Sequence, residues 1–483
     1  MTATKPVARN AANFNLMAFA MAGVFVLFYA VYIFRHSDFT NDDLDSLLLM
    51  RNSAFWSFLV TPIDVHFVPM HRLLTVLVYW LSPMNFGITV FISTGLHIAT
   101  IVYLYRLLRL LDVGQASWLV VCCYAISVVP FFGMIWWAHA EHRFPYVFFA
   151  VYAAFHYLTW LRQGGRWHFL ACVIAFFIGL GFYEKMVLLP AQMVAFGLFW
   201  NPRKFVTEWR HSMAIPFFIG ILSLVYVVLY LSLKPQAGHV SIVLAVEAIV
   251  EFIKMLGISI TGVSLVDLSP TDQIGWSGQA LFSVILWSAV FIFSVVRCRR
   301  SFWIWLGLLG ILCLDYLPIA LSNRVYLYAF VIAHQYRFGF EELFVVAIFL
   351  GLVLREILPV TELALAGSRR RLAACLIVVF YAVSNILGLH FAIQQNLAII
   401  LQNDSHRYMR NLRHDISRLN DSSAGFEYSP LPRYMSIFDL VHDAGSVLQL
   451  FEPTARIGLT KQVADYWISD DGHIHREPHG GSR

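Results

Sequence analysis

Long apolar stretches dominate the chain, and short polar connections separate them. A run of about 18–22 apolar residues is long enough to cross the hydrocarbon core of a bilayer as a helix. The pattern predicts about eleven such spans, and we therefore expect an all-α polytopic membrane protein. The spans fall near residues 14–34, 86–105, 117–133, 144–161, 167–182, 186–200, 213–233, 279–296, 301–321, 338–354 and 372–393.

Two outer segments between the spans are long enough to form structure of their own. The first, residues 35–85, holds two amphipathic stretches, around 43–59 and 68–81. We expect these helices to lie along the membrane interface. The second segment, residues 234–279, contains a further amphipathic stretch around 240–256.

The chain after residue 393 is much less hydrophobic than the rest. Residues 404–419 predict a charged helix, and short β-like pieces follow near 464–474. We therefore divide the chain into a membrane domain, 1–393, and a small C-terminal α/β domain, 394–483.

Basic residues gather in alternate connections, and this predicts the orientation of the chain. Cytoplasmic loops are enriched in Lys and Arg, so we place these connections and the N-terminus in the cytoplasm. The C-terminal domain then lies on the outer side, after an odd number of spans. The first span lacks a cleavage pattern, and we expect it to be retained. The basic residues are Lys5, Arg9, Arg106, Arg109, Arg162, Arg166, Arg203, Lys204, Arg210, Arg297, Arg299, Arg300, Arg369, Arg370 and Arg371.

Composition narrows the class of protein further. Hydrophobic residues make up 59% of the 483 residues and charged residues only 13%, too few to cover the surface of a soluble protein of this size. The net charge of +5 comes without a dense basic tract, so nucleic acid is not an expected partner. The six cysteines have no metal-ligand spacing and lie within spans or at a cytoplasmic edge, which predicts neither a disulfide nor a zinc site.

An acidic cluster, Asp38, Asp42, Asp43 and Asp45, follows the first span directly. One interpretation is a helix start, in which Thr40 is the N-cap of a capping box and Asp43 is its acidic partner. The other is catalytic: Asp42 faces a cleft and takes a proton from an acceptor hydroxyl. Adjacent helical residues point in different directions, so a cap and a base can coexist in one dipeptide.

Cationic and polar groups follow on the same predicted side of the membrane. His66, His71 and Arg72 lie within seven residues of each other, and cations there would suit a phosphate head group. His139 follows Trp136 and Trp137 in a second polar group. The alternative is a set of solvated or capping side chains beside an interfacial aromatic belt, which we favour for the tryptophans.

Two later segments add charges on the predicted outer side. Glu184 and Lys185 adjoin each other in an apolar context, where they either neutralise each other or present Lys185 to a lipid phosphate. Arg324 and Arg337 lie outside despite the cytoplasmic bias of basic residues, and Tyr336 precedes the second. Arginine is well suited to planar, bidentate contact with phosphate.

The sequence also restricts the donor of any transferred group. It has no Gly-rich nucleotide loop, and no cytoplasmic connection is large enough for a nucleotide-binding domain. A cytosolic nucleotide sugar is therefore not expected as the donor. A membrane-soluble phosphate ester fits better.

The order of these short motifs resembles the GT-C superfamily of polytopic glycosyltransferases, in particular its bacterial members. The motifs are Asp42-Asp43 after the first span, His66 three residues before Pro69, Trp136-Trp137 before a span with Pro145, and Glu184-Lys185. Protein O-mannosyltransferases and aminoarabinose transferases are more distant relatives in this resemblance, which covers about residues 14–390.

The resemblance implies inverting transfer of a sugar from a polyprenyl-phosphate donor to a glycan, lipid or protein acceptor, at the outer face of a bacterial inner membrane. Asp42 corresponds to the general base, and Asp43 is the second acid. Because Asp43 is shorter than the glutamate of the mannosyltransferases, the use of a divalent metal stays open, and no other cofactor is implied. The donor phosphate would contact His66, Arg72, Lys185, Arg324 and Arg337. The acceptor or sugar would contact Glu184, His139 and Tyr336.

Two other functions stay open. A lipid-linked glycan ligase or polymerase would share the lipid donor, but we expect it to use Arg and His of a later outer loop. A lipid or solute transporter is the non-enzymatic alternative. Against it, the sequence shows no internal repeat, and Asp315 and Glu247 lie in polar or near-boundary stretches rather than in mid-span.

Overall fold

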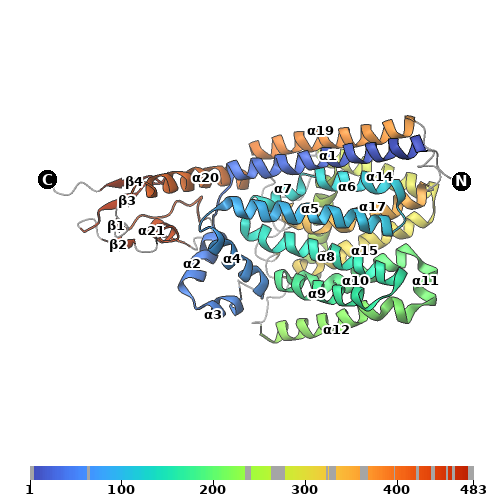
Figure 1. Ribbon diagram of the computed structural model, residues 1–483, viewed down its shortest axis with the longest axis horizontal. Coiled ribbons are helices and arrows are strands. Elements are labelled where there is room, and N and C mark those ends of the chain that lie inside the picture. Colours follow the sequence, from blue (N-terminus) through green and yellow to red (C-terminus); the bar gives the residue numbers. More distant parts are fainter. Residues whose placement is uncertain are drawn as a thin grey trace. The chain divides into compact units, whose positions relative to one another are not determined.

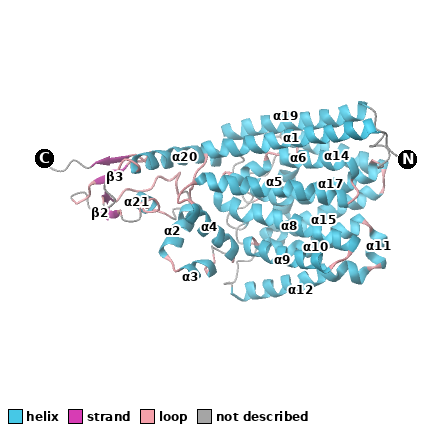
Figure 2. Cartoon of the chain, viewed as in Figure 1, coloured by secondary structure: helices cyan, strands magenta, loops and turns pink. Residues whose placement is uncertain are grey.

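The computed structural model consists largely of α-helices, and the strands it describes all follow residue 424 (Figures 1 and 2). It describes residues 5–62, 66–233, 241–262, 278–322, 325, 333–334, 336–358, 368–395, 397–419, 424–436, 441–452, 455–459 and 463–476.

Seven of the described helices are long and apolar enough to cross a membrane, which confirms the prediction of an all-α polytopic membrane protein. Each contains a stretch of at least 18 residues with few charged side chains. The helices are α1 (Lys5–His36, apolar from Phe19), α5 (Phe86–Leu110), α8 (Trp137–Gln163), α12 (Trp209–Leu233), α14 (Gly278–Arg297), α15 (Arg300–Ala320) and α19 (Ser368–Gln395).

Four of the eleven predicted spans correspond to helices outside this set. Three of these helices are short: α6 (Ser117–Ile126), α9 (Arg166–Phe182) and α10 (Leu189–Trp200). The fourth, α17 (Tyr336–Ile357), is long enough but carries charged side chains near both of its ends. The number of membrane crossings therefore stays a prediction.

The chain divides into two compact units, each made of several separate segments. The first, which we call the bundle unit, contains Met1–Phe28, Thr94–Gly133 and Arg143–Ala392. The second, the loop–tail unit, contains Tyr29–Ser93, Met134–His142 and Ile393–Arg483. In the loop–tail unit the C-terminal segment thus groups with the first predicted outer loop, while the division at residue 393 stays a prediction.

Helix packing forms the core of the bundle unit. The helices α15 and α17 pack together, and both contact α13 (Ile242–Ile260), the helix that the amphipathic stretch 240–256 predicts. Phe252 of α13 stacks on Tyr316 of α15, with ring centroids 4.2 Å apart. The shorter elements are η1 (Gly114–Ala116), α7 (Val129–Met134), η2 (Glu184–Leu188) and α11 (Pro202–Thr207).

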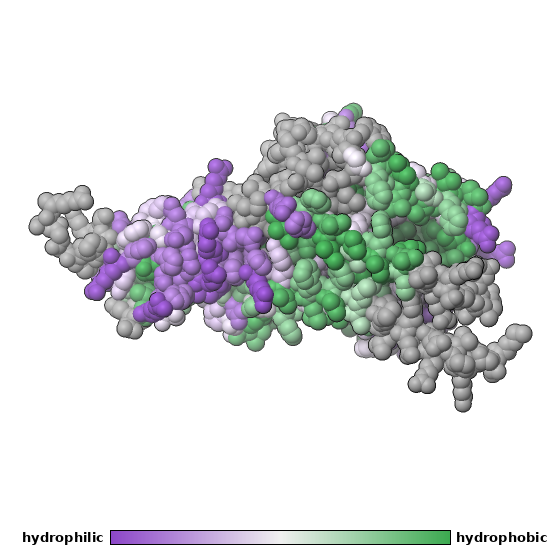
Figure 3. Space-filling view, turned by 90° about the horizontal axis from the view of Figure 1, so that it is seen from above, coloured by the Kyte–Doolittle hydropathy of each residue, from purple (hydrophilic) through white to green (hydrophobic). Residues whose placement is uncertain are grey.

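Apolar side chains also cover much of the outward surface of the bundle unit, as the green areas of Figure 3 show. On α12 and α14, Leu224, Phe293 and Val296 are each more than 60% exposed. Exposed apolar surface on this scale is unfavourable in water and typical of helices that face lipid.

The loop–tail unit combines short helices with a small sheet. The amphipathic stretch 68–81 forms α4 (Pro69–Leu81), whereas 43–59 forms two helices, α2 (Asp42–Asn52) and α3 (Phe55–Val60). The predicted charged helix is α20 (Leu397–Ile416), which begins earlier than the charged residues indicate. The tail adds α21 (Ala444–Leu448) and strands β1 (Gly425–Glu427), β2 (Arg456–Leu459), β3 (Tyr466–Ile468) and β4 (Ile474–Arg476).

The four strands form one sheet in the order β2-β1-β3-β4. Strand β1 pairs in parallel with β2 and β3, and β3 pairs with β4 in the antiparallel sense. Phe426 and Tyr466 stack on the buried side of this sheet, with ring centroids 5.5 Å apart. The sheet thus gives the C-terminal segment a core of its own within the loop–tail unit.

Candidate functional site

The segment between α1 and α2 holds polar residues that are buried. Asn41 adopts φ 46° and ψ −118°, a conformation that non-glycine residues rarely adopt. Such strain costs about 1–3 kcal/mol and persists only where the surroundings impose it. Here the Asn41 N–H donates to the carbonyl oxygen of Met435 at 2.9 Å. The strained residue directly precedes the Asp42–Asp43 pair and sets the direction in which α2 begins.

Asp43 joins two parts of the loop–tail unit. Its Oδ2 accepts the Thr40 N–H at 3.1 Å, and its Oδ1 accepts the Ala138 N–H at 2.6 Å. The first bond belongs to the predicted capping box, but the prediction of Thr40 as N-cap is wrong by one residue. The N-cap is Asn41, because the strained backbone delays the helix until Asp42.

Burial raises the pKa of Asp43 well above its usual range, and the charges of Glu141 and Asp42 raise it further. The two backbone N–H donors oppose this shift. Asp43 is therefore a poor candidate for a base that must meet an acceptor. Its neighbour Asp42 is only partly buried and keeps contact with the exterior of the unit.

A buried guanidinium lies beside the acidic cluster. Arg72 of α4 is 2% exposed, donates from Nη1 to Ser46 Oγ at 3.2 Å, and lies over the ring of Phe58 at 4.4 Å. Burial lowers the pKa of Arg72 to about 10, while the charges of Glu141 and Asp45 raise it. The group thus stays cationic at neutral pH and offsets part of the negative charge around α2.

Glu141 and His71 form a second buried pair in the same unit. His71 Nε2 lies 2.5 Å from Glu141 Oε1, and Thr75 Oγ1 donates to Glu141 Oε2 at 2.8 Å. The ring of His142 lies 5.6 Å from that of His71. Glu141 belongs to the polar group that follows Trp136 and Trp137 but is not among the predicted site residues. The available signal was an acidic residue at the start of an apolar span, where ionisable groups are usually functional.

The tail contributes helix α20 to this region. Arg413 binds Asp38 with two hydrogen bonds, of 2.5 and 2.6 Å, and Asp38 also accepts the Phe39 N–H at 2.9 Å. Gln402 Nε2 donates to the Ile135 carbonyl oxygen at 2.9 Å. Asp38 therefore has a structural role, and we do not count it among the catalytic candidates.

The other predicted site residues are distributed between the two units. Asp42, Asp43, His66, Arg72 and His139 belong to the loop–tail unit, where His139 is buried with its ring 4.2 Å from that of Trp136. Glu184, Lys185, Tyr336 and Arg337 belong to the bundle unit. Arg324 lies outside the described residues, as do the side chains of Tyr336 and Arg337.

Lys185 is engaged by carboxylates of helix α17. Its Nζ lies 3.0 Å from Glu341 Oε2 and also forms an ion pair with Glu342. It is 8% exposed. A contact between Lys185 and a donor phosphate stays a prediction, and it would require these pairs to rearrange.

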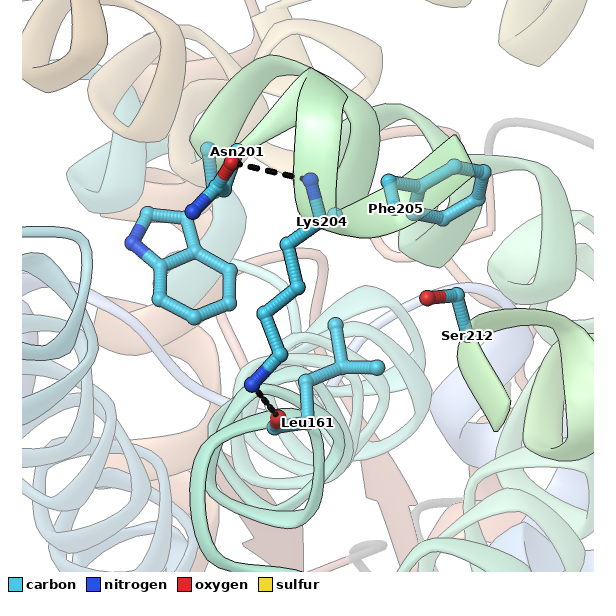
Figure 4. Close-up of a pocket in the computed structure, with 7 residues that line it drawn as sticks. Leu161, Asn201, Lys204, Phe205 and Ser212 are labelled. Carbon is cyan, nitrogen blue, oxygen red and sulfur yellow. Dashed lines mark hydrogen bonds between the residues drawn. The ribbon is translucent and has the colours of Figure 1, made fainter. Parts of the chain in front are cut away.

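A crevice in the bundle unit holds a second lysine-centred arrangement (Figure 4). Lys204 Nζ donates to the Leu161 carbonyl oxygen at 2.9 Å, and the Lys204 N–H donates to Asn201 Oδ1 at 3.1 Å. The crevice has an empty volume of about 170 Å³, but this space is too narrow to hold a water molecule. Lys204 therefore caps the end of α8 and is not a ligand-binding candidate.

Comparison with known proteins leaves the function to be argued from the site. No model of a known protein family matches the chain, and no curated protein matches it. Among the described residues, no group of three or more His, Cys, Asp or Glu side chains could hold a metal ion. The use of a metal stays open.

Proposed function

We propose that the protein is an inverting glycosyltransferase that moves a sugar from a polyprenyl-phosphate donor to an acceptor hydroxyl outside the cytoplasm. One observation carries the proposal. A partly exposed carboxylate, Asp42, follows a strained residue in a cluster of buried charged groups drawn from three separate parts of the sequence. Strained backbone and clustered ionisable groups are both typical of functional sites.

The proposed reaction uses Asp42 as general base. Its carboxylate takes the proton of the acceptor hydroxyl as that oxygen attacks the anomeric carbon of the donor. The bond between the anomeric carbon and the phosphate oxygen breaks, and the electron pair leaves with the polyprenyl phosphate. A displacement of this kind inverts the anomeric configuration.

The neighbouring groups support this division of roles. Asp43 is engaged by two backbone N–H groups, and its raised pKa favours the neutral form, so it positions the start of α2. Arg72 is a buried cation of the same unit, and its guanidinium is a type of group that binds phosphate well. Asp42, the more exposed carboxylate of the pair, is then the one that we assign to the acceptor.

Membrane vesicles supplied with labelled polyprenyl-phosphate sugar test the proposal. We expect Asp42→Asn to abolish transfer, a loss of at least about 100-fold for a missing general base. Asp404→Asn, which removes an exposed carboxylate on α20, is the control and should transfer at the wild-type rate. Wild-type turnover in Asp42→Asn would remove this residue from the mechanism.

A transporter is a second candidate because of one observation in the bundle unit. Asp315, which the sequence pattern places in a polar or near-boundary stretch, is 0% exposed, as is Glu341. Buried carboxylates within a membrane bundle are typical of ion and substrate pathways. Product analysis separates the two: a transporter moves labelled donor across vesicles intact, whereas a transferase yields a new glycoside.

A further inference from the structure

Five ionisable side chains meet in the interior of the bundle unit. They are Arg143 on α8, Lys185 on η2, Asp315 on α15, and Glu341 and Glu342 on α17, and each is at most 8% exposed. Three are acids and two are bases. If all were ionised, the group would hold one negative charge without a partner, and an uncompensated buried charge is strongly unfavourable.

The contacts show which carboxyl group lacks a cationic partner. Glu341 is paired with both cations: Arg143 through Nε and Lys185 through Nζ at 3.0 Å. Glu342 shares Lys185 through its Oε1. Asp315 forms an ion pair with neither Arg143 nor Lys185, and its Oδ2 accepts a neutral amide N–H from Gln192 at 2.9 Å.

Two carboxyl oxygens of this group lack a hydrogen-bond donor. Asp315 Oδ1 and Glu342 Oε2 are buried and have no hydrogen-bond partner. The two carboxyl groups adjoin each other closely enough for a hydrogen bond, which one of them would donate if it were protonated. Two ionised carboxylates in this arrangement would repel each other, whereas one protonated carboxyl would donate its O–H to the other.

We propose that Asp315 and Glu342 hold one proton between them, which neutralises the buried group of five. The proton supplies the missing positive charge and the missing hydrogen bond together. The other groups that interact with the pair are Lys185, Glu341, Tyr146 on α8 and Gln192 on α10, while Tyr316 on α15 interacts with Lys185. All five side chains belong to the bundle unit, and the proposal does not depend on the proposed function.

Infrared difference spectroscopy of the full-length protein in lipid vesicles reads out such a proton. The measurement compares neutral with strongly alkaline buffer and follows the carbonyl stretching band of a protonated carboxylic acid. We expect wild type to show this band at neutral pH. The buried Asp43 can add a band of its own, so the readout is the difference between wild type and each variant.

Asp315→Asn and Glu342→Gln should each lose this component completely, because either substitution alone balances the charges at two acids and two bases. In Asp315→Asn, the new amide can donate to Glu342 and keep the pair joined. Asp112→Asn, at an exposed carboxylate paired with Arg162, is the matched control and should keep the wild-type band. Two independent variants keep the test decisive if one of them fails to fold.

Either of two results would overturn the proposal. In the first, both variants fold and keep the full wild-type band, so that no proton was held by this pair. In the second, wild type lacks the band in sodium chloride and gains it in choline chloride, which would assign the missing charge to a sodium ion.

Discussion

The pairing of Arg413 with Asp38 gives the sharpest test of how the tail is attached. Arg413→Ala removes two charge-assisted hydrogen bonds to a carboxylate that is 1% exposed, and a third bond to the Met84 carbonyl oxygen at 2.9 Å. The Asp38 carboxylate would keep the Phe39 N–H, with His406 Nδ1 3.7 Å away.

The position of the pair sets the expected magnitude. Breaking a fully buried ion pair costs about 3–5 kcal/mol, whereas an exposed pair is worth about 0–1 kcal/mol. The Arg413 side chain is 32% exposed, so solvent screens the pair in part. We therefore expect Arg413→Ala to destabilise the loop–tail unit by about 2–3 kcal/mol, between these limits.

Limited proteolysis of the full-length protein in detergent measures this effect, because cleavage of the transiently opened tail follows its free energy of opening. Cleavage after residue 393 should become about 30- to 150-fold faster in Arg413→Ala, since 1.4 kcal/mol corresponds to a factor of ten. Arg407→Ala, which breaks an exposed pair with Asp404, should change cleavage less than about threefold. Equal rates in the two variants would refute the anchoring role of Arg413.

Two further predictions concern the same unit. Because the pKa of Asp43 is raised, the folded state binds its proton more tightly than the unfolded state, and its contribution to stability falls as pH rises through the raised pKa. Melting temperatures measured from about pH 5 to about pH 8 should therefore fall less in Asp43→Asn than in wild type or Asp404→Asn, and parallel curves would contradict this. Gly472→Ala should destabilise by about 3 kcal/mol, because φ is +85° and a Cβ would collide with the Tyr408 carbonyl oxygen. Gly458→Ala, at φ +69° with nothing within 4 Å, should cost only about 1 kcal/mol in the same unfolding assay, and equal losses would show that the collision is relieved.

The long apolar helices and α4 could be predicted because hydrophobicity and its period are local properties of the sequence. The short helices show the limit of this signal. Residues 117–133 are mostly apolar, yet α6 ends at Ile126 and Ser127 turns the chain before α7 begins. The hydrophobicity of this stretch changes little at the break. By contrast, α9 ends at Phe182 as predicted, because the charged Glu184 and Lys185 interrupt the apolar sequence there.

The candidate site was predictable only in part. The four aspartates stand out because carboxylates are scarce beside a membrane span. Their partners do not, because the backbone N–H of Ala138 has no sequence signature and Arg413 lies 375 residues from Asp38. In the bundle unit, Lys185 pairs with Glu341 and Glu342, which lie 156 and 157 residues away and which the sequence does not indicate as its partners, while its contact with a phosphate stays a prediction.

Mass spectrometry of the lipids retained by the purified protein tests the central claim most directly. A transferase that has lost its base should still bind its donor without consuming it. We expect Asp42→Asn to retain an isoprenoid phosphate with an attached sugar, enriched over the surrounding membrane and more abundant than in wild type. Retention of only bulk phospholipids, in the proportions of the membrane and equally in both proteins, would contradict the proposed donor.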